Sequence, residues 1–135
     1  MTQTNRDSTS VDKSSLQEMI DGYFRCWNAT ETVQRRAEVE AVWASGARSI
    51  DPLVDATGHE ELSAMFGGFH DTYVGHSFRQ VGSYDTHHQL VRWGWEMVGP
   101  DGSIALNGID VALLDDSHKI TYLAGFFGID LSAPV

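Results

Sequence analysis

The segment VRWGWEMVGPDGSIALNGIDVALL, residues 91–114, contains two runs of alternating side-chain character separated by the turn sequence GPDG. Alternation with a period of two is typical of strands that bury one face, and GPDG favours a tight turn. Similar runs occur at residues 77–85 and 118–128. The chain from residue 77 onward therefore predicts an antiparallel meander.

Three segments with helical spacing precede these strands. Apolar residues recur three and four positions apart at about 15–28, where Ser14 or Ser15 is a candidate cap, at about 31–45, and at about 59–73. A short strand at 47–50 ends at an Asp-Pro sequence, which turns the chain. Helices followed by strands predict an α+β domain, with three helices packed on a curved, mainly antiparallel sheet around an apolar pocket.

Composition limits the function classes. The chain has 135 residues and a formal net charge of −10, which disfavours binding to nucleic acid or to a membrane surface. Its one cysteine excludes an internal disulfide, and the polar N-terminus lacks the apolar core of a secretion signal. We expect a cytoplasmic protein with a disordered leader at 1–14, one domain at 15–130 and a tail at 131–135.

Asp110 lies within the strand pattern with apolar neighbours on both sides. Strand parity places Ile104, Leu106, Gly108, Ala112 and Leu114 on the same face as Asp110, and this face is apolar. The apolar set of the neighbouring strand contains Trp93 and Trp95, which we expect to line the same cavity. Burial without a cation raises the pKa of a carboxyl group, so Asp110 is predicted to favour its protonated form. An acid that only satisfies the core is the alternative.

Other candidates have simpler interpretations. His87 and His88 are adjacent on a strand, so they point to opposite faces and do not predict a metal site. His59 fits the first turn of the third helix, and no metal role is predicted for it either. His70 lies beside the apolar stripe of that helix and is a candidate for the pocket rim.

The order of elements, and strings distributed along the chain, resemble the NTF2-like superfamily and, within it, the SnoaL-like and ketosteroid-isomerase-like branch. The resemblance covers about residues 15–128 and predicts the cone-shaped NTF2-like fold. The strings that carry it are YFRCWNA, SIDPLVDATGHEEL, RWGWEMVGPDG, GIDVALLD and HKITYLAGFFG.

This resemblance implies roles for three residues. Tyr23 falls on the helix-one tyrosine of the steroid isomerases, with Asn28 completing the Y-x-x-x-x-N string, and Asp51 falls on their general base. Asp110 falls on their protonated oxyanion donor, and also on the acid/base aspartate of SnoaL-like cyclases. Phe66 replaces a helix-three tyrosine that supports the first tyrosine in the isomerases.

The predicted function is cofactor-independent acid/base chemistry on a hydrophobic carbonyl compound, either double-bond isomerisation or aldol-type cyclisation. A non-catalytic NTF2-like domain that binds a small ligand or supports dimerisation is the alternative. We expect no metal and no organic cofactor, and a homodimer formed through the sheet. The residues expected to hold the substrate are Trp93, Trp95, Phe127, Met65, Phe69 and His70.

Overall fold

A computed structural model describes residues 2–128 of the chain, with side chains from residue 15 onward. The helices are α1 (Thr2–Asn28), α2 (Thr32–Val42) and α3 (Gly58–Thr72). The strands are β1 (Trp43–Ile50), β2 (Asp55–Thr57), β3 (Ser77–His87), β4 (Leu90–Val98), β5 (Ile104–Leu114) and β6 (Ile120–Phe127).

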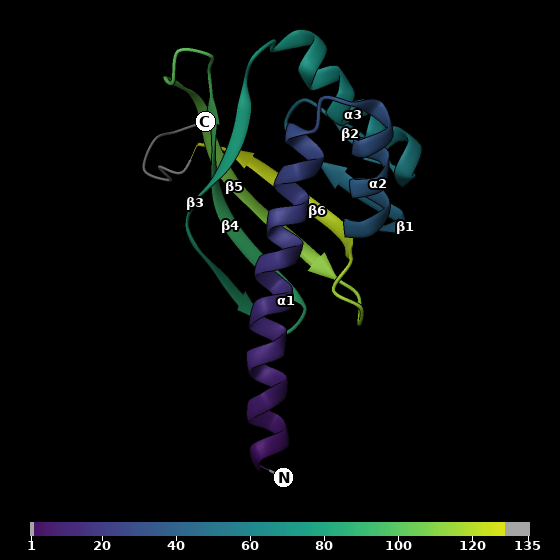
Figure 1. Cartoon of the computed structure of the whole chain (residues 1–135), viewed down its shortest axis with the longest axis vertical. Helices are drawn as coiled ribbons and strands as arrows, with labels where there is room; N and C mark the ends of the chain where they lie inside the picture. Colours follow the sequence, from purple (N-terminus) through teal and green to yellow (C-terminus); the bar gives the residue numbers. More distant parts are fainter. Residues whose placement is uncertain (1, 129–135) are drawn as a thin grey trace.

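The strands form one six-stranded sheet in the order β2-β1-β6-β5-β4-β3. Every neighbouring pair is antiparallel except β1 and β6, which are parallel. The helices pack against one face of this curved sheet, with α1 running lengthwise across it (Figure 1). The predicted α+β architecture, with three helices on a mainly antiparallel sheet, is confirmed.

The sheet is bent at irregularities in its pairing. Register shifts interrupt the β3–β4 ladder between Val81 and Asp85, and the β4–β5 ladder between Met97 and Val98. Gly82, inside the first of these shifts, has a φ of 68°, a conformation that glycine adopts without strain. Extra residues of this kind bend a strand and increase its twist.

Two predicted helix boundaries were wrong. α1 begins at Thr2 rather than near residue 15. The disordered leader expected at 1–14 stays a prediction. The polar start of the chain lacks the apolar repeat from which a helix is recognised. α2 ends at Val42, and Trp43 already belongs to β1, because the indole and Ala47 are buried together on one face of that strand. A domain limit at residue 15 stays a prediction, and the tail at 131–135 lies outside the described residues.

The predicted sidedness of β4 and β5 is confirmed around Asp110 but fails at one end. Gly108, Asp110, Ala112 and Leu114 are buried, as alternation requires. Ile104 is instead 52% exposed, because the register shift between Met97 and Val98 interrupts the alternation before the strand reaches it.

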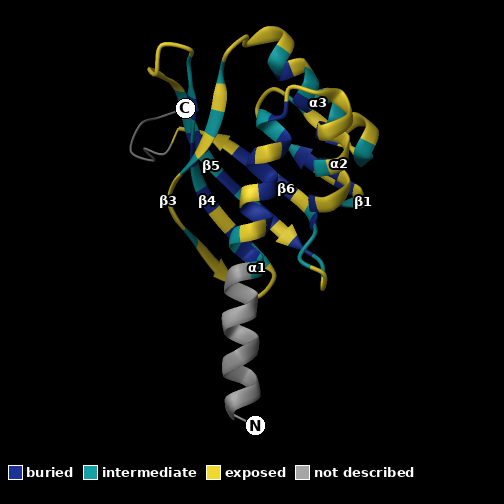
Figure 2. Ribbon diagram, viewed as in Figure 1, coloured by how far each residue is buried: buried dark blue, intermediate teal, exposed yellow. Residues whose placement is uncertain are grey.

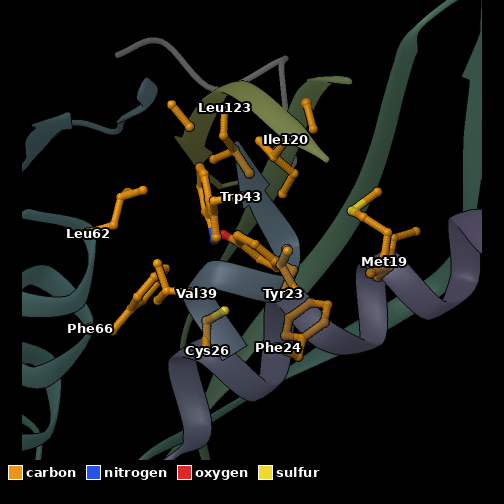
Figure 3. Close-up of a cluster of buried hydrophobic side chains, with 14 of the residues drawn as sticks. Met19, Tyr23, Phe24, Cys26, Val39, Trp43, Leu62, Phe66, Ile120 and Leu123 are labelled. Atoms are coloured by element: carbon orange, nitrogen blue, oxygen red, sulfur yellow. The ribbon is translucent and has the colours of Figure 1, made fainter. Parts of the chain in front are cut away.

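The core lies between the helices and the concave face of the sheet (Figure 2). Tyr23 of α1 points towards Trp43 of β1, and Met19 and Phe24 belong to the same buried cluster (Figure 3). Tyr23 packs against Trp43 and Trp93, with ring centroids 6.1 Å and 5.1 Å away. These contacts fix α1 over the centre of the sheet. Among the described residues, no helix has the length and apolar character needed to cross a membrane.

Candidate active site

A cavity of about 440 Å³ opens between α1, α3 and the concave face of the sheet. Its wall is mostly apolar, with a few polar groups. Small residues of α3 leave the space open, since Ala64, Gly68 and Thr72 recur every four positions along the lining. The polar or ionisable side chains of the lining are those of Tyr23, Trp27, Ser49, Asp51, Thr72, Tyr73, Trp95 and Asp110.

Asp110 and Tyr23 form a hydrogen-bonded pair in the wall of this cavity. The Tyr23 hydroxyl donates to Asp110 Oδ2 over 2.6 Å, and both side chains are buried. Burial, together with the nearby carboxyl group of Asp110, raises the pKa of Tyr23 well above its ordinary value. The phenol therefore stays protonated and acts as a hydrogen-bond donor to Asp110 at neutral pH.

Burial raises the pKa of Asp110 to about 7, against 3.8 for an ordinary aspartate. The hydrogen bond from Tyr23 opposes this shift, and the neighbouring Asp51 adds to it. A carboxyl group with this pKa exists in charged and neutral forms in comparable amounts near neutral pH. Such a group can both accept and release a proton during a reaction.

Asp51 follows β1 and lies in the wall of the same cavity. Its Oδ1 accepts hydrogen bonds from the backbone N–H groups of Leu53 (2.8 Å) and Val54 (2.9 Å), which fixes the Asp-Pro turn. Gly125 separates the two acids: a Cβ at this position would lie 3.0 Å from Asp110 Oδ1 and 3.2 Å from Asp51 Cβ. The absence of a side chain at Gly125 thus allows the carboxyl groups to approach each other.

Two tryptophans of β4 surround Asp110. The indole groups of Trp95 and Trp93 lower the pKa of Asp110, which opposes the effect of burial. Neither indole N–H has a regular hydrogen-bond partner among the described residues. Trp95 reaches the cavity, whereas Trp93 packs behind Tyr23 and does not line it.

The structure brings together the three residues to which the resemblance assigned roles, because Tyr23, Asp51 and Asp110 all line one cavity. Of the side chains expected to hold a substrate, Trp95, Phe127, Met65 and Phe69 also line it. Their positions agree with the prediction, while their roles in binding stay predictions.

Trp93 and His70 lie elsewhere. Trp93 is on the predicted face but is covered by Tyr23. His70 turns away from the cavity, because its Nε2–H donates to the Trp27 carbonyl oxygen over 2.6 Å and ties α3 to the end of α1. Asn28, in the string shared with the isomerases, is also structural, since its amide makes two hydrogen bonds to the backbone of Phe78.

Sequence reasoning missed further residues of the cavity wall, among them Ser49 and Gly125. Ser49 is buried in β1 and lines the cavity two positions before Asp51, so strand parity was the signal that would have identified it. Gly125 pairs with Asp110 across the β5–β6 ladder. No pattern within β6 alone reveals that contact.

The remaining histidines and the cysteine lie outside the cavity. His59 Nε2 donates to the Trp43 carbonyl oxygen over 2.8 Å, and His87 and His88 are exposed at the β3–β4 turn. Burial raises the pKa of the Cys26 thiol to about 12, so the thiol is neutral. Among the residues that the structure describes, no group of three or more histidine, cysteine or acidic side chains is placed to hold a metal ion.

The buried carboxyl group should make stability fall as pH rises. The folded state holds the Asp110 proton up to a pKa of about 7, whereas an unfolded aspartate releases it near 3.8. The stability that this proton provides is complete below pH 3.8 and is lost as pH rises to about 7. Over that interval we expect wild type to lose up to about 4 kcal/mol relative to Asp110→Asn.

Urea unfolding of both proteins at pH values from about 4.5 to 8 measures this difference. Titrations common to both proteins cancel in the comparison. Parallel stability profiles would show that Asp110 titrates in the folded protein as it does in an unfolded chain.

Comparisons with known proteins give structural matches only: no protein-family model and no curated protein matches this sequence. One similar solved structure is a candidate isomerase of the SnoaL-like family from Agrobacterium tumefaciens. It is 28% identical with a TM-score of 0.82, and the match covers 86% of this chain and 99% of that chain.

Two further structures share the fold at lower identity. A candidate SnoaL-like polyketide cyclase from Jannaschia is 14% identical, with a TM-score of 0.62 and coverage of 82% of this chain and 85% of that one. An NTF2-like protein of unknown function from Exiguobacterium is 18% identical, with a TM-score of 0.63 and coverage of 83% and 99%. The resemblance seen in the sequence is thus confirmed in the structure: this chain has the NTF2-like fold, and the solved structures similar to it include SnoaL-like proteins.

Proposed function

We propose that this protein is a cofactor-independent enzyme that moves a proton next to the carbonyl group of a hydrophobic compound. The observation that carries the proposal is the buried Asp110, with a pKa of about 7, held by Tyr23 in the wall of an apolar cavity. A titrating acid in a pocket of this kind is a common feature of active sites. Names of similar structures, an isomerase and a cyclase, agree with this class of reaction.

The proposed first step is common to both reactions. The charged carboxylate of Asp110 removes the proton from the carbon next to the carbonyl, and the electron pair of the broken C–H bond passes to the carbonyl oxygen as an enolate. In an isomerisation, the Asp110 carboxylic acid returns the proton to the far carbon of the conjugated system. In an aldol cyclisation, the enolate carbon attacks a second carbonyl of the same molecule, and the resulting alkoxide takes the proton.

In this proposal the polar groups around Asp110 set its pKa and stabilise the enolate. Tyr23 fixes the carboxyl group and supports its charged form, because its hydrogen bond lowers the Asp110 pKa. Asp51 keeps that pKa high enough for proton return. The enolate oxygen needs a donor at hydrogen-bond distance. Ser49, which lines the cavity, is the proposed donor.

A different assignment within the same chemistry makes Asp51 the base and neutral Asp110 a donor to the enolate, as the steroid isomerases suggest. The two assignments predict opposite pH dependences. If Asp110 is the base, the rate rises as pH increases through about 7; if it is the donor, the rate falls there. Under the second assignment, Asp51→Asn removes the base and lowers the rate by orders of magnitude.

Exchange of α-hydrogens for deuterium tests the proposal without knowledge of the final product. Apolar cyclic ketones, including β,γ-unsaturated ones, are incubated with the protein in D₂O and followed by NMR. We expect exchange well above the buffer rate, together with conjugation of the double bond in ketones that allow it. A panel that binds without any exchange would contradict the enzymatic proposal.

Tyr23→Phe is expected to lower the exchange rate about 10- to 100-fold and to move the pH midpoint of the rate upward. The change removes the hydrogen bond that lowers the Asp110 pKa, so the carboxyl group holds its proton to higher pH. The pH–rate profile of the variant measures both effects. A reduced rate with an unmoved midpoint would mean that the phenol does not act through Asp110.

A non-catalytic ligand-binding domain is the second candidate. The observation that favours it is the Asp51 side chain, one oxygen of which is already used by the Leu53 and Val54 N–H groups. Phe66 also packs against Trp27 and Trp43, where the isomerases have a supporting tyrosine. This candidate predicts that apolar ketones raise the unfolding temperature and are recovered unchanged.

We also propose that the protein forms a homodimer through the outer face of its sheet. Exposed apolar side chains on β5 and β6 support this assignment, namely Leu113, Tyr122 and Phe126. On the same outer face, Arg92 pairs within the chain with Asp85, and Glu96 pairs with Arg79.

A further inference from the structure

A second cavity, of about 550 Å³, lies between α2 and α3 and has a different character from the first. Its wall contains hydroxyl, guanidinium, imidazole and carboxyl groups in place of phenylalanine, tyrosine and tryptophan rings. The ionisable side chains of this wall are those of Arg35, Arg36, His70 and Asp71, and its hydroxyl groups are those of Thr30, Thr32 and Ser63.

Arg35 is a buried cation without an anionic partner. Only 7% of the residue is exposed, and no acidic group described in the structure forms an ion pair with it. Its Nε and Nη2 donate to the carbonyl oxygens of Ala29 (3.2 Å) and Thr30 (3.1 Å). These oxygens satisfy two donors but leave a full positive charge uncompensated, and a buried charge is stable only when it is paired.

The remaining guanidinium nitrogen, Nη1, lies against α3. A Cβ at Gly67 would come within 2.9 Å of this atom, so the glycine allows the guanidinium to lie against the helix backbone. Among the described residues, no hydrogen bond uses Nη1. This nitrogen is therefore a donor available to a ligand in the cavity.

Ser63 contributes a second unused donor. Its hydroxyl is buried and has no hydrogen-bond partner in the described part of the chain. A buried hydroxyl without a partner is uncommon and unfavourable, because water is removed from it without replacement. Ser63 and Arg35 line the same cavity from opposite helices.

The charges around the cavity favour one small anion. Arg36 is engaged by Glu40 at 3.0 Å, and the Nε2 of His70 is used by the Trp27 carbonyl oxygen. Asp71 is the acidic side chain in the wall, and it opposes an anion there. Arg35 remains as the uncompensated charge, and a tetrahedral oxyanion suits it because guanidinium and hydroxyl donors both bind phosphate oxygens well.

We propose that the cavity between α2 and α3 binds a phosphate group, either as free phosphate or as the head group of a small organic phosphate. Arg35 supplies the charge and Ser63 a hydroxyl donor. This inference does not rest on the proposed acid/base chemistry. Ala64 and Gly68 lie in the walls of both cavities, so an organic phosphate bound here is placed beside the apolar cavity across α3.

Calorimetric titration of the full chain with inorganic phosphate, at constant ionic strength set with chloride, tests the proposal. We expect saturable binding by wild type, about 10-fold weaker binding by Ser63→Ala, and about 3- to 10-fold tighter binding by Asp71→Asn. Arg35→Met is expected to abolish binding. Thermal unfolding in phosphate and in chloride gives an independent readout, since the general effect of phosphate on stability is shared by all variants.

The test remains decisive even if one variant does not fold. Arg35 also holds two backbone carbonyl groups, so if Arg35→Met does not fold, the opposite shifts expected for Ser63→Ala and Asp71→Asn decide the question. Titration with hexyl phosphate distinguishes the two possible ligands. Tighter binding than that of inorganic phosphate identifies an organic phosphate as the ligand, and equal binding identifies the free ion. No saturable binding of either compound, or equal affinities in wild type, Ser63→Ala and Asp71→Asn, would overturn the proposal.

Discussion

Asp110→Asn is expected to lower the rate of α-hydrogen exchange by about 10²- to 10⁴-fold, the range usual for removal of a general acid/base. An amide neither accepts nor returns the proton, yet it occupies the same volume and its oxygen still accepts the hydrogen bond from Tyr23. The fold should therefore survive. Exchange rates measured by NMR, with far-ultraviolet circular dichroism on the same samples, check both parts of this expectation.

Asp85→Asn is the matched control, because Asp85 is an exposed aspartate in a surface ion pair with Arg92. Surface pairs of this kind contribute little to stability, so this variant should behave as wild type. Activity that survives in Asp110→Asn but disappears in Asp51→Asn would assign the base to Asp51. Full activity in both variants would exclude proton transfer by either carboxyl group.

Gly108→Ala is expected to destabilise the protein by at least about 3 kcal/mol, the largest effect on stability that we predict for a single methyl group. A Cβ at this position would collide with the Phe126 carbonyl oxygen and with the indole ring of Trp95. Trp95 is the direct partner of Gly108 across the β4–β5 ladder. Relief of the collision requires the ladder or the indole beside Asp110 to move.

Chemical denaturation measures this loss, and Gly46→Ala serves as its control. Gly46 also lies in a strand, but a Cβ there meets no atom within 4 Å. Its replacement should change stability by less than about 0.5 kcal/mol. A stable Gly108→Ala protein with an unchanged denaturation midpoint would mean that β5 and Trp95 are less closely packed than described.

The periodicity of the sequence was enough to predict most of the fold, and the failures have local causes. Strand parity predicted that Asp110 and Trp95 share a buried face, because alternation is a property of the strand itself. Trp43 was assigned to a helix, since its spacing from Val39 fits a helical stripe, and only packing in the assembled sheet shows that it belongs to β1. The predicted burial of Ile104 was wrong because the pairing of β5 with β4 shifts near this residue, and the sequence of β5 alone does not show such a shift.

For the site, resemblance and parity identified the acids but not the depth of the side chains around them. Trp93 and Trp95 have the same parity, yet Tyr23 covers one and leaves the other in the cavity wall. His70 was placed at the rim because it is next to an apolar stripe, but a backbone carbonyl of α1 holds it on the other side of α3. Contacts between distant segments decide these positions, and spacing within one element does not contain them.

The parallel pairing of β1 with β6 has a consequence for the order in which the chain folds. β6 lies between β1 and β5 in the sheet, so β1 and the short β2 paired with it join the other strands only through residues 120–127. Loop closure over such a distance is entropically unfavourable and slows folding. The β3–β5 meander can form from neighbouring hairpins, whereas the wall that carries Asp51 and Gly125 must assemble last. During synthesis, the apolar cavity therefore cannot form before the last strand, β6, has been made.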